Sequence, residues 1–415
     1  MKNKPYPKYK PSGVEWLGDV PEHWGVKKLK NQVTINDETL PETTDPDYEM
    51  LYVDISSVDP AQGIIQKEGL IFENAPSRAR RIVRDGDTIV STVRTYLRAI
   101  APVIEPEKNL TVSTGFAVIR PRKIDKDYLS ATIRAPYFIE EVVSRSVGAS
   151  YPAINASEIG FIAVPLPPLP EQQAIGAFLD RETGRIDALI AKKQRLLELL
   201  AEQRTALISR AVTKGLDASV KLKPSGVEWL GDVPEHWEVK ALKHVVYLKS
   251  GDGITIEEIE EEGEYPVYGG NGFRGFSNKF THEGEFVLIG RQGALCGNIN
   301  YAKGKFWASE HAIVANPSKP IATSWLGELL RIMNLNQYSV SAAQPGLAID
   351  RIKELYLPVP PLPEQQAIAA FLDRETTKID MLSAKVTTLI ERLKEYRTAL
   401  ISSAVTGKID VREAV

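Results

Sequence analysis

The chain has 415 residues, of which 43% are apolar and 25% charged, and a formal net charge of −3. This length predicts two or three domains, and the composition is that of a folded protein rather than a disordered one. The charge excludes a uniformly basic nucleic-acid binder, although a DNA-binding surface can be local.

Targeting and redox signals are sparse. The first residues lack an apolar signal region, and no stretch approaches eighteen uninterrupted apolar residues, so we expect a cytoplasmic protein. Cys296 is the only cysteine, which excludes an internal disulfide and a cysteine-based zinc cluster. We expect Cys296 to be a small buried residue.

An opening segment occurs twice in the chain. Residues 11–24 return unchanged as residues 224–237, at an offset of 213. A period near two hundred residues is too long for a solenoid and indicates a duplicated domain. For the histidines of the two segments, His23 and His236, packing is favoured over catalysis.

The regions after the opening segments differ in sequence but share some anatomy. Asp85–Val90 resembles Glu283–Leu288, an acidic-Gly-acidic turn leading into a β-branched strand, at an offset of 198. Ser113–Pro121 resembles Ser309–Pro317 at an offset of 196. Both regions are therefore predicted to be mixed α/β domains. The predicted strands are Met50–Asp54, Thr88–Val93, Ala117–Ile119, Pro266–Tyr268, Phe286–Ile289 and Ala312–Val314, and the predicted short helices are Asp127–Val143 and Trp325–Asn336.

Each half then contains a long segment that begins with several prolines and continues without any. Its start, Pro167–Ile175, is repeated letter for letter as Pro360–Ile368, at an offset of 193. The last proline of each copy stands where a helix tolerates it, so helices are predicted from about Glu171 and Glu364. At about 1.5 Å per residue, some forty residues span roughly 60 Å, which indicates a spacer.

These segments carry an apolar repeat that predicts a coiled-coil seam. In the second copy, apolar residues recur every seven positions from Ile379 and again from Leu382. The predicted seam residues are Ile186, Leu189, Leu196, Leu200, Leu207, Ile379, Leu382, Val386, Leu389, Leu393, Tyr396 and Leu400. Leu197, Leu199 and Ile390 are predicted to be outer apolar positions.

The densest basic cluster runs from Arg78 to Arg84, with Arg94 and Arg98 beyond the next strand. A solvated charged face is the alternative, because two aspartates lie among these residues. Arginine suits bidentate contacts to guanine and glutamine suits adenine, whereas other basic residues contact phosphates. The candidate DNA-contacting residues are Arg78, Arg80, Arg81, Arg84, Arg94, Arg98, Arg274, Lys279, Arg291, Gln292, Lys303 and Lys305.

No motif in the sequence predicts catalysis. Gly270–Gly275 fits Gly-x-Gly-x-x-Gly, but no helix is predicted after it, and Asn271-Gly272 is a hairpin-turn signal. The sequence contains no nucleophile elbow, no Gly-x-x-x-x-Gly-Lys-Ser/Thr loop and no His-x-x-x-His pair. The chain is therefore predicted to be non-catalytic.

Together these features resemble the specificity subunit of type I restriction-modification systems. The resemblance covers nearly the whole chain. It rests on the twin Pro-Pro-Leu-Pro-Glu-Gln-Gln-Ala-Ile helices, the twin Ser-Gly-Val-Glu-Trp-Leu-Gly segments and Tyr265–Gly275. It implies two α/β target recognition domains, separated by two long antiparallel conserved helices that form an intramolecular coiled coil. Each domain would read one half of an interrupted, asymmetric DNA sequence.

The resemblance also implies partners. Two modification subunits would bind S-adenosylmethionine and methylate adenine. Restriction subunits would add translocation and cleavage that need ATP and Mg, in defence against foreign DNA, and no cofactor or metal is expected in this chain. Two alternatives remain: a duplicated coiled-coil scaffold without a DNA role, and a fused methyltransferase-specificity protein, against which the lack of an Asn-Pro-Pro-Phe/Tyr motif argues.

The expected organisation follows the chain. It comprises an opening segment and first recognition domain (1–166), a long helix (167–213), a linker (214–223), a second opening segment and recognition domain (224–359), and a second long helix with a tail (360–415).

Overall fold

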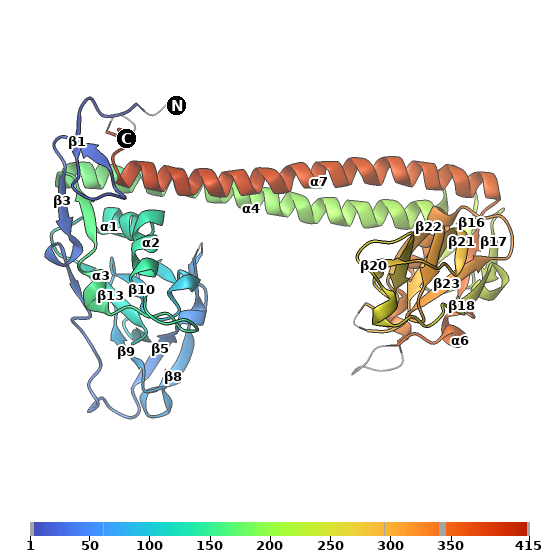
Figure 1. The fold of residues 1–415 in the computed structure, drawn as a ribbon, viewed down its shortest axis with the longest axis horizontal. Coiled ribbons are helices and arrows are strands. Elements are labelled where there is room, and N and C mark those ends of the chain that lie inside the picture. The colour runs from blue at the N-terminus through green and yellow to red at the C-terminus, as the bar shows by residue number, and fades with distance from the viewer. Residues whose placement is uncertain (1–3, 61, 294, 340–345, 413–415) are drawn as a thin grey trace. The chain divides into compact units, whose positions relative to one another are not determined.

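The computed structural model describes residues 4–60, 62–293, 295–339 and 346–412. The chain forms two compact units (Figure 1). Unit 1 consists of residues 1–193 and 388–415, and unit 2 of residues 194–387. Each unit therefore contains one opening segment, one variable region and parts of both long helices.

Unit 1 contains two four-stranded sheets, in the orders β11-β10-β13-β4 and β8-β5-β12-β9. Strands β5 and β12 are parallel, and buried side chains from both sheets, such as Val53, Ile89, Val112 and Phe116, share one core. Its strands before the long helix are β1 (Tyr9–Pro11), β2 (Asp19–Pro21), β3 (Gly25–Lys28), β4 (Val33–Ile35), β5 (Glu49–Val53), β6 (Val58–Asp59), β7 (Gly63–Ile64), β8 (Glu68–Ile71), β9 (Ala79–Ile82), β10 (Thr88–Ser91), β11 (Ile100–Pro102), β12 (Leu110–Ser113), β13 (Phe116–Pro121) and β14 (Ala163–Leu166). Its short helices are α1 (Lys126–Ile133), α2 (Pro136–Ser144) and α3 (Ala156–Ile159), with 3-10 turns η1 (Leu29–Asn31), η2 (Ile55–Ser57), η3 (Phe72–Asn74) and η4 (Thr95–Leu97).

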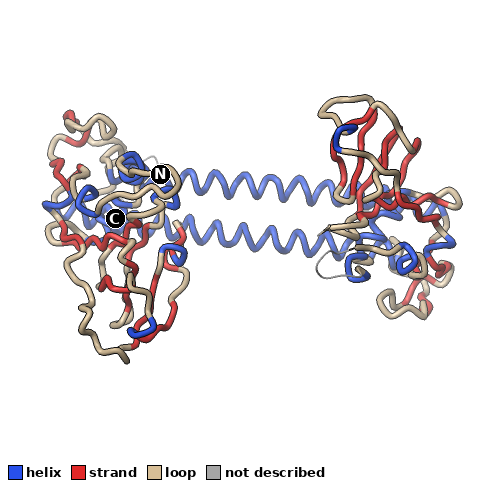
Figure 2. Tube along the Cα trace, turned by 60° about the horizontal axis from the view of Figure 1, so that its bottom comes forward, coloured by secondary structure: helices blue, strands red, loops and turns tan. Residues whose placement is uncertain are grey.

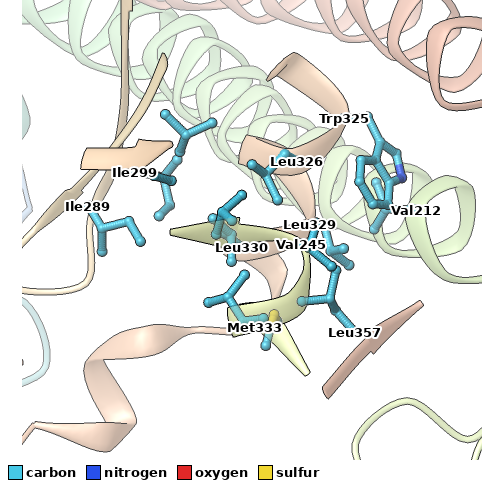
Figure 3. Close-up of a cluster of buried hydrophobic side chains, with 14 of the residues drawn as sticks. Val212, Val245, Ile289, Ile299, Trp325, Leu326, Leu329, Leu330, Met333 and Leu357 are labelled. Carbon is cyan, nitrogen blue, oxygen red and sulfur yellow. The ribbon is translucent and has the colours of Figure 1, made fainter. Parts of the chain in front are cut away.

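Unit 2 is built on one six-stranded sheet, in the order β18-β23-β21-β22-β19-β20. Helix α5 packs on this sheet, and Figure 3 shows its Trp325, Leu326 and Leu329 in a core that also receives Val212 from the first long helix. Its strands are β15 (Leu222–Pro224), β16 (Asp232–Pro234), β17 (Glu238–Ala241), β18 (Val246–Ser250), β19 (Tyr265–Gly269), β20 (Gly272–Ser277), β21 (His282–Gly290), β22 (Ile299–Ala308), β23 (Ala312–Pro317) and β24 (Tyr356–Val359). Its short helices are α5 (Thr323–Ile332) and α6 (Ile349–Ile352), with 3-10 turns η5 (Leu242–His244), η6 (Ile256–Glu258) and η7 (Leu335–Tyr338).

The six predicted strands are confirmed, within a few residues at their ends. The predicted helix Asp127–Val143 is two helices, because Pro136 restricts Ala135 to an extended conformation and starts α2. The predicted helix Trp325–Asn336 ends earlier, at Ile332, and Asn334 takes a left-handed conformation with φ of 46°.

The two long helices, α4 (Leu169–Lys214) and α7 (Leu362–Val405), pair antiparallel. In unit 1 the carboxylate of Asp187 lies 2.9 Å from Arg397 Nε, and in unit 2 that of Asp380 lies 3.2 Å from Arg204 Nε. The two pairs are the same contact made twice, because 187 + 193 = 380 and 204 + 193 = 397. The intramolecular coiled coil is confirmed (Figure 2). None of the described helices has the length and apolar character of a membrane span.

Eight of the twelve predicted seam residues are buried or half-buried. Ile186, Leu200, Val386 and Leu400 are buried as expected, and Leu196, Leu207, Ile379 and Leu393 are half-buried. The prediction is wrong for four residues, whose exposed fractions lie between 39% and 56%: Leu189, Leu382, Leu389 and Tyr396.

The second row of the seam lies one residue further along each helix. It contains Ile190 and Ile390, which are buried, and Leu197, which is half-buried. Along each helix the observed seam therefore steps four residues and then three, starting from Ile186 and Val386. The predicted seam steps three residues and then four. Both alternations fit a 3.5-residue period, and apolar side chains occur in both rows, so periodicity alone does not separate them.

A buried carboxylate holds each opening segment to the start of a long helix. Glu171, 6% exposed, accepts hydrogen bonds from Tyr6 Oη at 2.5 Å and Trp24 Nε1 at 3.1 Å, and lies 2.8 Å from His23 Nε2. Burial and the neighbouring carboxylate raise the pKa of Tyr6, so its hydroxyl remains a donor.

The arrangement is repeated in unit 2. Glu364 accepts from Trp237 Nε1 at 3.0 Å and lies 2.9 Å from His236 Nε2. The packing role predicted for the two histidines is confirmed, and it operates through this carboxylate.

The glutamine that follows this glutamate in each motif binds the variable region of its unit. Gln172 accepts from the amide of Asp125 at 2.8 Å and donates to Pro167 O, and Gln365 accepts from the amide of Ala322 at 3.1 Å. Asp125 and Ala322 are the N-caps of α1 and α5. The repeated Pro-Glu-Gln motif thus joins the opening segment, the long helix and the variable region in each unit.

Cys296 is buried, as expected, with 2% of its surface exposed. Its thiol lies 3.2 Å from Asn336 Oδ1, and burial raises its pKa, so the thiolate is disfavoured. The cysteine is a packing residue.

Replacing Ile390 with alanine should lower the free energy of unfolding by about 2–4 kcal/mol, because it removes apolar volume from the closed seam. Leu389→Ala, at the adjacent exposed position, is the matched control and should cost less than about 1 kcal/mol. Urea denaturation followed by circular dichroism measures both. Equal losses for the two variants would place Leu389 in the seam.

Candidate nucleic-acid interface

In each unit three distant segments meet where the central strand ends. In unit 1 the amide of Thr92, just after β10, donates to Gly115 O at 2.8 Å, and Thr92 O accepts from the amide of Ile154 at 2.8 Å. In unit 2 the amide of Arg291, just after β21, donates to His311 O, and Arg291 O accepts from Leu347, both at 2.8 Å. We call this backbone arrangement the strand-end junction.

The junction corrects the alignment of the two variable regions. Ile89 pairs with Val118, and Leu288 with Val314. Because 118 + 196 = 314, Ile89 corresponds to Leu288, an offset of 199 rather than 198. The predicted acidic turn in the second region is wrong, since Glu283–Glu285 lie inside β21, paired with β22.

Two glycines allow a hairpin to close onto the junction of unit 2. A Cβ atom on Gly290 would lie 2.3 Å from Gly270 O, and one on Gly270 would lie 2.8 Å from His311 O. Strands β19 and β20 pair Gly269 with Gly272, which leaves Gly270-Asn271 as the turn. The predicted hairpin is confirmed, but its turn lies one residue earlier than the predicted Asn271-Gly272. The glycine pattern serves a close backbone approach rather than a dinucleotide site.

The basic cluster of unit 1 divides between the two ends of β9. Arg78 is exposed at the junction end, where its carbonyl accepts from the amide of Thr114 at 2.7 Å. Arg84, at the other end, forms an ion pair with Glu38. The cluster therefore does not form one surface, because an extended strand separates its ends.

The side chains of Arg80 and Arg81 are engaged within unit 1. Arg80 lies over the Phe72 ring at 4.3 Å and donates to Ala79 O at 3.0 Å. Arg81 is half-buried, donates to Thr39 Oγ1 at 3.2 Å, and has a pKa lowered by burial. These contacts favour the structural alternative for both residues.

Arg94 and Arg98 flank the short turn η4 beside the junction. Both are exposed and left-handed, with φ of 51° and 53°, a conformation that costs a non-glycine residue about 1–3 kcal/mol. Buried Thr95 anchors the turn through Ser146 Oγ at 2.8 Å. The Arg94 guanidinium lies 5.0 Å from the centre of the Tyr151 ring, and no ion pair engages either arginine among the described residues.

The candidates of unit 2 also separate into two groups. Arg291 and Gln292 lie at the junction, and Arg274 lies exposed on β20 with its aliphatic stem against Gly269. Lys303 and Lys305 stand opposite Glu285 and Glu283 in the β21–β22 register, so their charge is locally balanced, and Lys279 is exposed after β20.

Sequence reasoning missed three exposed or half-buried side chains at the junctions: Tyr96, Tyr151 and His311. Tyr96 and Tyr151 are 53% and 66% exposed. The resemblance of Ser113–Pro121 to Ser309–Pro317 could have pointed to His311, because it aligns this residue with Gly115. No sequence signal connects Tyr151 with Arg94.

The chain matches known proteins along most of its length. Residues 21–199 and 234–392 match the profile described as type I restriction modification DNA specificity domain. The EcoprrI specificity subunit of Escherichia coli is 45% identical over 152 residues, which span 36% of this chain and 37% of that subunit. The putative MjaX specificity subunit of Methanocaldococcus jannaschii is 24% identical over 95% of this chain and 96% of that one.

Solved structures share the fold. A chain from a type I R-M system aligns with a TM-score of 0.73 at 23% identity, over 94% of this chain and 99% of that one. The HsdS subunit from Thermoanaerobacter tengcongensis aligns with a TM-score of 0.59, also at 23% identity, over 94% and 98% of the two chains. Two profile matches, one in each half, and relatives named specificity subunits agree with the duplicated units and their paired junctions. The chain belongs to the type I restriction modification DNA specificity family, whose members are non-catalytic recognition subunits.

Proposed function

We propose that the two recognition domains, residues 1–166 and 224–359, each read one half of an interrupted, asymmetric DNA target with their strand-end junctions. The repeated junction carries this proposal: one backbone arrangement presents Thr92 in unit 1 and Arg291 in unit 2. Because the backbone arrangement is the same and the side chains differ, the two domains would recognise different short DNA sequences. A scaffold without a DNA role would leave this difference unexplained.

The chain directs adenine methylation and restriction carried out by other subunits in the cytoplasm. Two modification subunits would supply S-adenosylmethionine, and restriction subunits ATP and Mg. The exposed apolar row of Leu382, Leu389 and Tyr396 on α7 supports docking of partners along the helices. Family membership argues against the fused methyltransferase.

The methylated sequence in the host tests the proposal directly. Sequencing modified adenines should give two different half-sites separated by an unspecified spacer, because the two junctions present different side chains. A palindromic site would contradict it.

Arg94→Ala and Arg291→Ala should each weaken recognition of one half-site by about 1–3 kcal/mol, because a bidentate base contact is worth that much. Arg84→Ala is the matched control: this arginine already pairs with Glu38, so target preference should not change. Competition binding to half-site variants by the assembled complex measures all three. If Arg94→Ala and Arg291→Ala leave base preference unchanged, the junctions do not read DNA.

The long helices should act as the ruler between half-sites. Inserting one heptad after Leu196 and one after Leu389 keeps the seam in phase and lengthens the helix pair by about 10 Å. With base pairs about 3.4 Å apart, the spacer should grow by about three base pairs while both half-sites stay the same. An active complex that methylates the original spacer would show that other elements set this distance.

A further inference from the structure

Three side chains stand in a row at the junction of unit 2. Gln292 Oε1 lies 3.0 Å from His311 Nδ1, and His311 Nε2 lies 3.2 Å from Glu310 Oε1. Gln292 is exposed, whereas Glu310 and His311 are half-buried. The backbone fixes the row, because the amide of Arg291 donates to His311 O and Gln292 bridges to Gly346.

The order of hydrogen-bond donors and acceptors along this row determines the orientation of the side-chain amide of Gln292. The carboxylate of Glu310 only accepts, so the hydrogen of a neutral His311 ring is on Nε2 and Nδ1 is an acceptor. Nδ1 then requires the amide nitrogen of Gln292. A half turn about the last side-chain bond exchanges this nitrogen with Oε1 and moves no other heavy atom.

This orientation leaves a defined edge for DNA. One amide hydrogen of Gln292 is used by His311, while the other hydrogen and the carbonyl oxygen have no further hydrogen-bond partner among the residues that the structure describes. A neighbouring acceptor and donor match the N6 amino group and N7 of adenine in the major groove. We propose that His311, oriented by Glu310, is a positioning residue that holds Gln292 to read an adenine in the half-site of the second recognition domain. This inference rests on the proposed function of the junction.

Unit 1 provides an internal comparison. The residue equivalent to His311 is Gly115, because 115 + 196 = 311, and the residue equivalent to Gln292 is Val93, because 93 + 199 = 292. Neither can form this row. Changes at His311 should therefore affect the second half-site alone, and the first half-site is the control within the same molecule.

The test measures base preference at each position of both half-sites, by selection from randomised DNA with the chain assembled with its modification subunits. Gln292→Ala should lower discrimination for adenine at one base pair by about 5- to 150-fold. His311→Ala should lower it at the same base pair by about 2- to 10-fold, the worth of one hydrogen bond. His311→Asn should retain it, because the asparagine oxygen can accept where Nδ1 does.

The double variant separates positioning from a general structural role. If His311 acts through Gln292, His311→Ala should cause no further loss in a Gln292→Ala background. Losses at every position of both half-sites, equal losses for His311→Ala and His311→Asn, or a preference for a base other than adenine would overturn the inference. If neither Gln292→Ala nor Arg291→Ala changes the second half-site, the proposed junction itself fails.

Discussion

The carboxylate in the first turn of each long helix is the contact on which the rest of the structure depends. Glu171 joins the opening segment to α4 while almost fully buried, where it accepts hydrogen bonds from Tyr6 and Trp24 and contacts His23. Removing it would leave buried indole and phenol groups unpaired, at about 1–3 kcal/mol for each. The other long helix ends at the same place: a Cβ on Gly407 would lie 2.4 Å from the Pro21 ring. A helix start, a helix end and a recognition domain are thereby locked together.

The identical frames and different inserts of the two halves follow from how each part is held. The joint at Glu171 uses specific side chains, so a change in any of them breaks it. The strand-end junction uses backbone amides and carbonyls, which every residue except proline offers in full. Thr92 and Arg291 thus occupy equivalent positions of the two junctions, and so do Gly115 and His311, while the backbone hydrogen bonds stay the same. The proposed reading surface could therefore change its base preference without refolding, because its frame does not depend on side chains.

Sequence patterns predicted the elements whose structure depends on residues close together in the chain. The long helices, the six strands and the hairpin near Asn271, though not the exact residues of its turn, follow from periodicity, proline placement and glycine. The seam prediction was wrong for four of twelve residues because neighbours such as Leu189 and Ile190 are both apolar, and only packing shows which one is covered. The candidate site was less predictable, since the junction joins residues twenty or more positions apart through backbone bonds that leave no side-chain pattern. The basic cluster from Arg78 to Arg84 looked continuous because its residues are close in sequence. The extended strand β9 nevertheless separates its two ends.

Each recognition domain is attached to both long helices, and this affects how the protein is made. Unit 2 is one continuous stretch, whereas unit 1 needs residues 388–415 to complete it. Tyr128 in α1, for example, donates to Val405 O at 3.2 Å. At about 5–20 residues per second, synthesis of the 194 residues of unit 2 takes roughly 10–40 s. During that time unit 1 lacks the segment that supplies Val405, so the first domain to be translated is the last to close. It is therefore the domain that most needs protection from aggregation in the nascent chain.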